Sequence, residues 1–295
     1  MYYTSIKKYL DDIFSEFQKE VKGLDSLCNL KKVSFAAGNV PDYNDKAQAL
    51  LYCLRYHFGY AFEYEYIYNN HILNSFNKET IGVLSVGCGN GIDLWALNRA
   101  IKRSHSRIKH INYLGVDCVD WYDHFELHNG DDNISYSICE VTKLEYLLEN
   151  IDVVIFPKSI SEMRYEDLEH LAELIDRCSN SLYVIASLRS DSSNMRKDSN
   201  SFDTIIEMLN EKEYNISEGY TNTIHYFDGP NSIIKNYPDY TYPDMALYYL
   251  SNLFSKCEAA DEDNLTCQEE CKEQLRRQPI LTTSQIRYQV LKIER

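Results

Sequence analysis

Hydrophobic positions recur at two different spacings along the chain. In residues 1–22 and 45–74, apolar side chains recur every three or four positions, which predicts two amphipathic helices. From residue 81 onward, short apolar runs alternate with helical segments, which is typical of a parallel sheet covered by helices on both faces. The runs that we expect to form parallel strands are residues 81–87, 111–117, 134–138, 152–156 and 181–187.

The rest of the chain carries the helices and strands that complete this pattern. We expect helices at about 92–104, 120–128, 142–149, 164–178 and 201–212. Two further strands are predicted at 216–227 and 282–294, separated by an insertion at 228–281. The sequence therefore predicts an α/β fold with a Rossmann-like, seven-stranded, mostly parallel sheet over residues 79–295, preceded by a helical extension over residues 1–78.

Composition and charge limit where the protein is expected to act and which partners it is expected to bind. No apolar run approaches the roughly 20 residues of a membrane helix, and the N-terminus has no signal-peptide pattern, so we expect a cytoplasmic protein with no membrane partner. The nine cysteines are then expected to be reduced. A net charge of −15 disfavours nucleic acid as a partner without excluding it. The densest basic segment, residues 98–110, is expected to end at the amino ends of the strands, away from the ligand-binding edge.

The most informative stretch is "VLSVGCGNG", residues 83–91, where an apolar strand runs into a turn with three glycines and then a helix. Such a turn places backbone N–H groups and the positive end of a helix at one point, where a polar or anionic ligand can approach. A dinucleotide fold uses the spacing G-x-G-x-x-G, whereas Ile92 stands at the position of its third glycine. The spacing therefore favours a different nucleoside ligand, and a merely tight turn is the alternative.

This stretch resembles the first motif of the class I S-adenosylmethionine-dependent methyltransferases, apolar-apolar-acid-apolar-G-x-G-x-G. The resemblance implies that S-adenosylmethionine is the cofactor and that its loop comprises Gly87, Cys88, Gly89 and Gly91. The sequence departs from the motif at Ser85, where the family most often has Asp or Glu. In the family that acid helps to order the loop and the methionine amino group.

Later segments resemble the family's other motifs in the same order. The end of the second predicted strand offers Asp117 and Cys118 for the ribose, although Asp117 is also well placed to cap a helix. The resemblance assigns Glu140 and Val141 to the adenine. It assigns the loop after the fourth strand to the sulfonium region, and it implies that the last strand runs antiparallel beside the fifth. The residues of that loop are Phe156, Pro157, Lys158 and Ser159.

A second resemblance concerns one branch of the family, the ribosomal small-subunit-associated methyltransferase-like proteins. It rests on Arg55 and Tyr60 in the helix before the glycines and on the Ser161-Glu162 pair in "SISEM". Proteins of this branch also carry clustered cysteines. Here the cluster lies in the insertion and consists of Cys257, Cys267 and Cys271. Three thiolates are one short of a closed zinc or iron-sulfur site, so both metal binding and simple packing stay open.

Methyl transfer is an in-line displacement, so the protein mainly aligns and desolvates the reactants. The candidates for a catalytic role are Lys158, Glu162 and Tyr60, and those for substrate contact are Arg55, Tyr240 and Tyr242. An ion pair or a packed ring is the alternative for Arg55 and Tyr60. Three hypotheses follow: a methyltransferase for a small-molecule or protein acceptor, a ribosome-associated RNA methyltransferase, and a non-catalytic cofactor-binding or scaffold protein.

Overall fold

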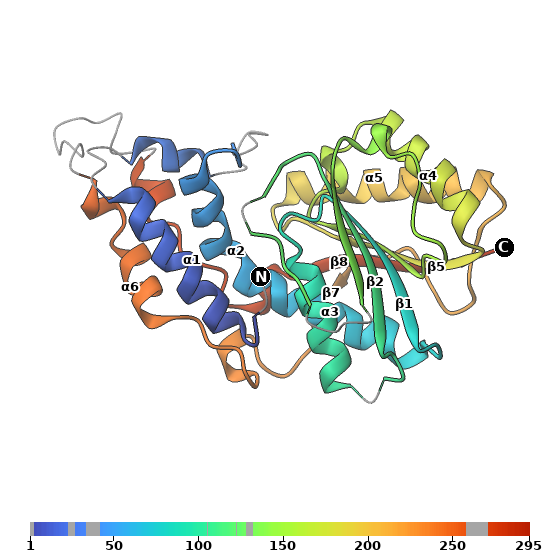
Figure 1. Ribbon diagram of the computed structural model, residues 1–295, viewed down its shortest axis with the longest axis horizontal. Helices are drawn as coiled ribbons and strands as arrows, with labels where there is room; N and C mark the ends of the chain where they lie inside the picture. The colour runs from blue at the N-terminus through green and yellow to red at the C-terminus, as the bar shows by residue number, and fades with distance from the viewer. Residues whose placement is uncertain are drawn as a thin grey trace. The chain divides into compact units, whose positions relative to one another are not determined.

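A computed structural model describes residues 3–22, 27–33, 42–104, 106–121, 123–127, 132–257 and 271–295. The chain divides into two compact units, which we call the helical unit and the sheet unit (Figure 1). The helical unit comprises Tyr3–Phe62 and Asn231–Thr283, and the sheet unit comprises Glu63–Pro230 and Ser284–Arg295. Among the described residues, no helix combines the length and the hydrophobicity that crossing a bilayer requires.

The sheet unit is built on one mixed sheet with the strand order β3-β2-β1-β4-β5-β8-β6, and β7 also pairs with β8. The first five strands are parallel, and β8 runs antiparallel to β5, which confirms the predicted arrangement. The strands are β1 Thr80–Val86, β2 His110–Asp117, β3 Asn133–Ile138, β4 Val153–Pro157, β5 Ser181–Ser187, β6 Asn215–Ile216, β7 His225–Tyr226 and β8 Arg287–Glu294.

The register of the central strands brings their following loops to one edge. Ser85 of β1 pairs with Gly115 of β2 on one side and with Ile155 of β4 on the other. The loops after β1, β2 and β4 therefore leave from the same carboxyl edge. The strand order reverses between β1 and β4, which is where α/β sheets of this kind bind their ligands.

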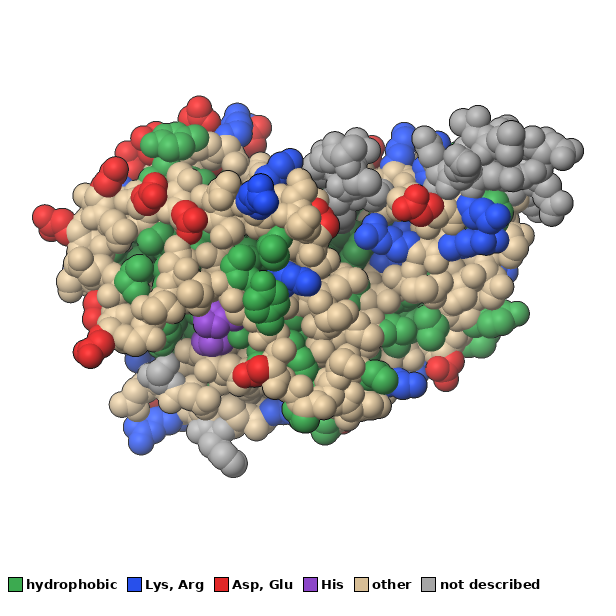
Figure 2. Space-filling model, turned by 180° about the vertical axis from the view of Figure 1, so that it is seen from behind, with side chains coloured by type: hydrophobic (Ala, Val, Ile, Leu, Met, Phe, Trp, Pro, Cys, Tyr) green, Lys and Arg blue, Asp and Glu red, His purple; other side chains and the backbone are tan. Residues whose placement is uncertain are grey.

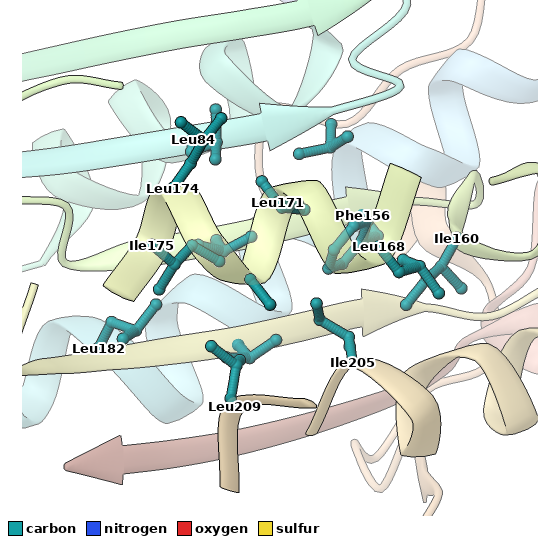
Figure 3. Packing of buried hydrophobic residues seen from close by; sticks show 14 of the residues in the cluster. Leu84, Phe156, Ile160, Leu168, Leu171, Leu174, Ile175, Leu182, Ile205 and Leu209 are labelled. Carbon is teal, nitrogen blue, oxygen red and sulfur yellow. The ribbon is translucent and has the colours of Figure 1, made fainter. Parts of the chain in front are cut away.

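Helices cover both faces of the sheet: α4 and α5 lie on one face and α3 on the other (Figure 1). Apolar side chains of α4 and α5 pack against alternate residues of β4 and β5 (Figure 3). Burying these side chains supplies most of the driving force for this arrangement. The helices of the sheet unit are α3 Ile92–Arg103, α4 Tyr165–Cys178 and α5 Ser192–Glu211, with short helices η3 Tyr68–Ile72, η4 Leu73–Ser75, η5 Val141–Lys143 and η6 Ile160–Glu162.

The helical unit begins with α1, Ile6–Val21, where Ser5 caps the helix by accepting a hydrogen bond from the backbone N–H of Lys8. Its buried face carries the apolar residues that predicted the helix. The second predicted helix is α2, Lys46–Ile67, which passes from the helical unit into the sheet unit. The remaining helices are η1 Cys28–Lys32, η7 Ile234–Asn236, α6 Asp244–Ser251, η8 Phe254–Lys256 and η9 Thr283–Gln285.

Two predicted helices are wrong. The described residues 119–121 and 123–127 form no helix, because Trp121 and Phe125 pack from a loop although their spacing is helical. Residues 142–149 contain only the end of the short helix η5, and Leu144 and Leu147 enter the core from an irregular segment. In these two segments, apolar residues spaced three or four positions apart are therefore buried without forming a helix.

Two other predicted elements have different bounds. The helix α5 begins at Ser192 rather than near 201, because Asp191 accepts a hydrogen bond from the backbone N–H of Asn194 and caps it. The predicted strand 216–227 appears as the two short strands β6 and β7, both paired with β8.

Candidate functional site

The glycine turn joins β1 to α3 in a backbone conformation that other residues rarely adopt. Gly87, Gly89 and Gly91 have φ values of +70°, +58° and +86°, all in the left-handed region. Gly91 is also the residue that precedes the first turn of α3. The chain therefore needs glycine at all three positions for its backbone alone.

Close approach of neighbouring side chains adds to this requirement at two of the glycines. A Cβ at Gly87 would overlap the side chain of Ser159, and a Cβ at Gly91 would overlap the hydroxyl of Tyr136. At Gly89 the nearest atom to such a Cβ is a ring carbon of Trp121, 3.7 Å away. Protein side chains therefore occupy the Cβ direction of Gly87 and Gly91 and leave that of Gly89 more open, and Gly87 and Gly89 are both partly exposed.

Asp117 connects the end of β2 to the glycine turn. One carboxylate oxygen accepts the backbone N–H of Gly89 at 2.8 Å, and the other accepts that of Val119 at 2.9 Å. Burial raises the pKa of Asp117, although these hydrogen bonds act in the opposite direction. Each oxygen keeps a further lone pair, so the carboxylate can accept hydroxyl groups from a ligand at the carboxyl edge.

The other residues predicted to line the cofactor differ in how much of their surface is exposed to solvent. Cys88 is buried, and a Cβ at Gly115 would meet its sulfur, so only the backbone of Cys88 can face a ligand. Cys118 is exposed after Asp117, and Val141 is buried. Glu140 is half exposed and lies 3.7 Å from Lys143 and 3.8 Å from Arg164.

Of the residues predicted for the sulfonium region, Phe156 and Pro157 end β4, and Lys158 and Ser159 lie in the loop after it. Phe156 is buried in the core, and Lys158 has a left-handed φ of +65°. The ammonium of Lys158 donates to a carboxylate oxygen of Glu63 at 2.8 Å and to the carbonyl of Leu188 at 2.6 Å. Ser187 donates to the same oxygen of Glu63 at 2.7 Å. The candidate catalytic lysine is therefore committed to a buried ion pair.

Burial changes the proton affinity of both members of this pair. It raises the pKa of Glu63 and lowers that of Lys158, while each group's attraction to the other acts in the opposite direction. The left-handed backbone at Lys158 is a strained conformation for a residue with a side chain. The pair therefore fixes the loop after β4, next to the point where Ser159 packs against Gly87.

Glu162 lies in η6 and is the carboxylate of the segment between β4 and α4. Its oxygen is 3.6 Å from a nitrogen of Arg189, which in turn binds Asp198 at 2.7 Å. Although 38% of its side-chain surface is exposed, desolvation by the surrounding protein raises the pKa of Glu162 to about 7, with Arg189 opposing the effect and the negative charges of Asp117 and Asp198 adding to it. Asp117 ends β2 and Glu162 follows β4, so both carboxylates lie at the carboxyl edge of the sheet.

The candidates for substrate contact lie in the helical unit, where packing uses their side chains. Tyr242 donates its hydroxyl to the carbonyl of Leu54 at 2.8 Å. Tyr240 packs edge-on against the rings of Phe58 and Phe62. The third candidate for substrate contact, Arg55, is also buried, and so is Tyr60, a candidate for a catalytic role.

The cysteines of the insertion are only partly described. Cys257 and Cys271 are buried free thiols, and the sulfur of Cys257 accepts the backbone N–H of Leu27 at 3.4 Å. Cys267 lies outside the described residues. Within the part of the chain that the structure describes, no three His, Cys, Asp or Glu side chains are grouped as a metal site would require.

Asp93 is a residue of the site region that the sequence analysis did not single out. It lies in the first turn of α3 with 0% of its surface exposed, and Tyr113 donates to its two oxygens at 3.0 and 3.2 Å. Burial raises the pKa of Asp93 to about 6, although the hydroxyls of Ser85 and Tyr113 act in the opposite direction. The sequence signal that could have identified Asp93 is its position two residues after Gly91, the last glycine of the turn.

Comparisons with known proteins give structural likenesses only. No family model matches the sequence, and no curated protein does. The structure of the plantazolicin methyltransferase BpumL in complex with SAH matches with 12% identity and a TM-score of 0.45, over 97% of this chain and 99% of that one. The geranyl diphosphate C-methyltransferase from Streptomyces coelicolor A3(2) matches with 10% identity and a TM-score of 0.37, over 98% and 99%.

The sheet itself identifies the fold. Five parallel strands in the order β3-β2-β1-β4-β5 are followed by an antiparallel β8, and a glycine turn leads from β1 into α3. This chain has the class I S-adenosylmethionine-dependent methyltransferase fold.

Proposed function

We propose that this chain is an S-adenosylmethionine-dependent methyltransferase that acts on a small molecule or a protein. The observation that carries the proposal is the hydrogen bond between Asp117 and the backbone N–H of Gly89. It joins a carboxylate suited to ribose hydroxyls with a partly exposed glycine of the turn whose Cβ direction protein side chains leave open. Both lie at the carboxyl edge beside the switch in strand order.

In this proposal the chain binds and orients the reactants. S-adenosylmethionine, when bound, supplies an electrophilic methyl group on a sulfonium. Asp117 would accept the ribose hydroxyls, and the half-exposed Glu140 with the adjoining Val141 would meet the adenine. The loop after β4, fixed by the ion pair of Lys158 with Glu63, would hold the acceptor side rigid. Alignment and exclusion of water then lower the barrier to displacement.

Glu162 is the group that we propose to hold a proton from the acceptor. Because its pKa is about 7, it is ionised above that pH and can accept a proton there. We expect kcat/KM to fall about tenfold per pH unit below pH 7 and to be level above it. The change Glu162→Gln should abolish this pH dependence, and Glu166→Gln, an exposed acid in the first turn of α4, should preserve it. A pH profile that is the same in wild type and Glu162→Gln would contradict the role.

The net charge supports an acceptor other than nucleic acid. Both acidic and basic side chains are present on the face shown in Figure 2, with hydrophobic side chains between them. A nucleic acid gains most of its affinity from neutralised phosphates, which a chain of net charge −15 opposes. A small molecule or a protein has no such requirement.

Isothermal titration calorimetry with S-adenosylmethionine and S-adenosylhomocysteine tests whether the cofactor binds. We expect a single site with micromolar affinity, followed by incorporation of labelled methyl groups when fractions of a cell extract are supplied. Binding without incorporation into any fraction would favour a non-catalytic cofactor-binding protein. Absence of heat with both ligands at millimolar concentration would contradict the proposed function.

Trp121 provides an independent signal for binding at Gly89. It is one of two tryptophans in the chain, and its ring lies beside both Gly89 and Asp117. We expect S-adenosylhomocysteine to change the tryptophan emission of wild type and of Trp95→Phe, but not that of Trp121→Phe. Trp95 is the matched control because it is buried in α3, where its ring stacks with Arg99. If Trp95→Phe lost the response and Trp121→Phe kept it, the ligand would not lie at Gly89.

A further inference from the structure

Arg55 is a positively charged side chain that is enclosed in the helical unit. It lies in the middle of α2, and 0% of its surface is exposed. Arginine is almost never fully buried unless it is paired, because removing its charge from water costs several kcal/mol. The surroundings of Arg55 therefore require an explanation.

The hydrogen bonds of Arg55 use only part of its guanidinium group. Its Nη2 atom donates to the backbone carbonyl of Gln274 at 2.5 Å. Among the described residues, neither Nε nor Nη1 has a hydrogen-bond partner. The side-chain oxygen of Gln274 is also buried without a partner, but an amide oxygen carries no charge that could neutralise a guanidinium.

No carboxylate among the described residues compensates the charge of Arg55. The ionisable groups that act on it are the phenols of Tyr56 and Tyr242 and the guanidinium of Arg277. Burial lowers the pKa of Arg55 to about 10, and Arg277 adds to this effect, so Arg55 still carries its charge at neutral pH. Two guanidinium groups therefore lie close together in a chain whose net charge is −15.

We propose that the helical unit binds an oxyanion, the carboxylate or phosphate group of a small molecule, at Arg55. Such a group accepts the N–H donors that Nε and Nη1 leave unused and supplies the missing negative charge. Because these atoms are shielded from solvent, the attraction between the charges is stronger than at the surface. All the residues involved belong to the helical unit, whereas Gly89 and Asp117 belong to the sheet unit, so this proposal does not rest on the proposed methyl transfer.

Thermal unfolding and calorimetry of the full chain test this proposal, with sodium phosphate and sodium acetate compared with sodium chloride at equal ionic strength. We expect phosphate, acetate or both to raise Tm by several degrees in a saturable manner, and chloride to have no such effect. The stronger of the two responses identifies a phosphate or a carboxylate as the preferred group. If neither anion raised Tm beyond the chloride control, the proposal would be overturned.

Substitutions localise the effect. Arg55→Met keeps the length of the side chain without its charge, and we expect it to raise Tm in chloride and to lose the response to the oxyanion. Arg276→Met is the control, because Arg276 is exposed and lies over the ring of Phe254 at 5.3 Å. It should respond as wild type does.

Arg55→Lys keeps the test valid if Arg55→Met does not fold. Lysine retains the charge but has a single donor nitrogen, so the affinity for the anion should fall at least tenfold. An unchanged affinity in Arg55→Lys, or an anion response that persists in Arg55→Met, would show that the anion binds elsewhere.

Discussion

Replacing Asp117 with alanine is expected to weaken the binding of S-adenosylhomocysteine by about 100-fold or more. The proposed site gives this carboxylate two hydroxyl partners, and a hydrogen bond to a charged group contributes roughly 1.5–3 kcal/mol. The substitution also removes the acceptor for the N–H of Gly89, so the turn loses a contact that shapes it. Calorimetry on the purified variant measures the loss directly.

Two further variants separate ligand contact from loop structure. Asp120→Ala removes an exposed carboxylate three residues away, and it should bind as wild type does. Asp117→Asn keeps one acceptor oxygen for the N–H of Gly89 but lacks the charge. Its affinity for S-adenosylhomocysteine should therefore lie between those of Asp117→Ala and wild type. If Asp117→Ala bound S-adenosylhomocysteine with unchanged affinity while remaining folded, the ribose assignment would be wrong.

The strands could be predicted because a strand that is buried on both faces of a sheet appears in the sequence as a continuous apolar run. Five parallel strands and the antiparallel final strand follow from that pattern and from the family resemblance. The helices predicted after β2 and β3 were wrong for a related reason. Trp121 with Phe125, and Leu144 with Leu147, are buried at helical spacing from irregular segments. Spacing alone does not distinguish a helix from a loop that inserts every third or fourth side chain.

How much of the site could be predicted depends on how far apart in the sequence its contacting residues lie. The glycines and their left-handed backbone follow from one contiguous motif. The contacts around these glycines do not follow from the motif, because Ser159 reaches Gly87 from the loop after β4 and Tyr136 reaches Gly91 from β3. A one-dimensional pattern gives no indication of such tertiary pairs.

The pair of Lys158 and Glu63 shows the same limit, because the partners are 95 residues apart. Sequence predicted a donor at Lys158 but not the carboxylate that binds it. The family motif likewise directed attention to Ser85 rather than to Asp93, whose burial only the fold reveals.

Replacing Asp93 with asparagine is expected to stabilise the protein at pH 8. The pKa of Asp93 is raised from 3.8 to about 6 in the folded chain, which corresponds to about 3 kcal/mol of stability. The folded protein therefore binds a proton on the Asp93 carboxylate more tightly than the unfolded chain does. The contribution is therefore present below pH 4 and is lost as the pH rises through 6. Asparagine has no charge to bury and can still accept the hydroxyl of Tyr113.

Urea unfolding of wild type and Asp93→Asn between pH 4 and pH 8 measures this effect. The difference in unfolding free energy should grow in favour of the variant by up to about 3 kcal/mol across this range. Asp191→Asn is the control of opposite sign, because Asp191 caps α5 and its pKa is lowered by its bonds to Asn194 despite partial burial. Its stabilising contribution is present at neutral pH and is lost as the pH falls. If Asp93→Asn became less stable than wild type on going from pH 4 to pH 8, the carboxylate of Asp93 would be favourably solvated in the fold, and the buried charge inferred here would not exist.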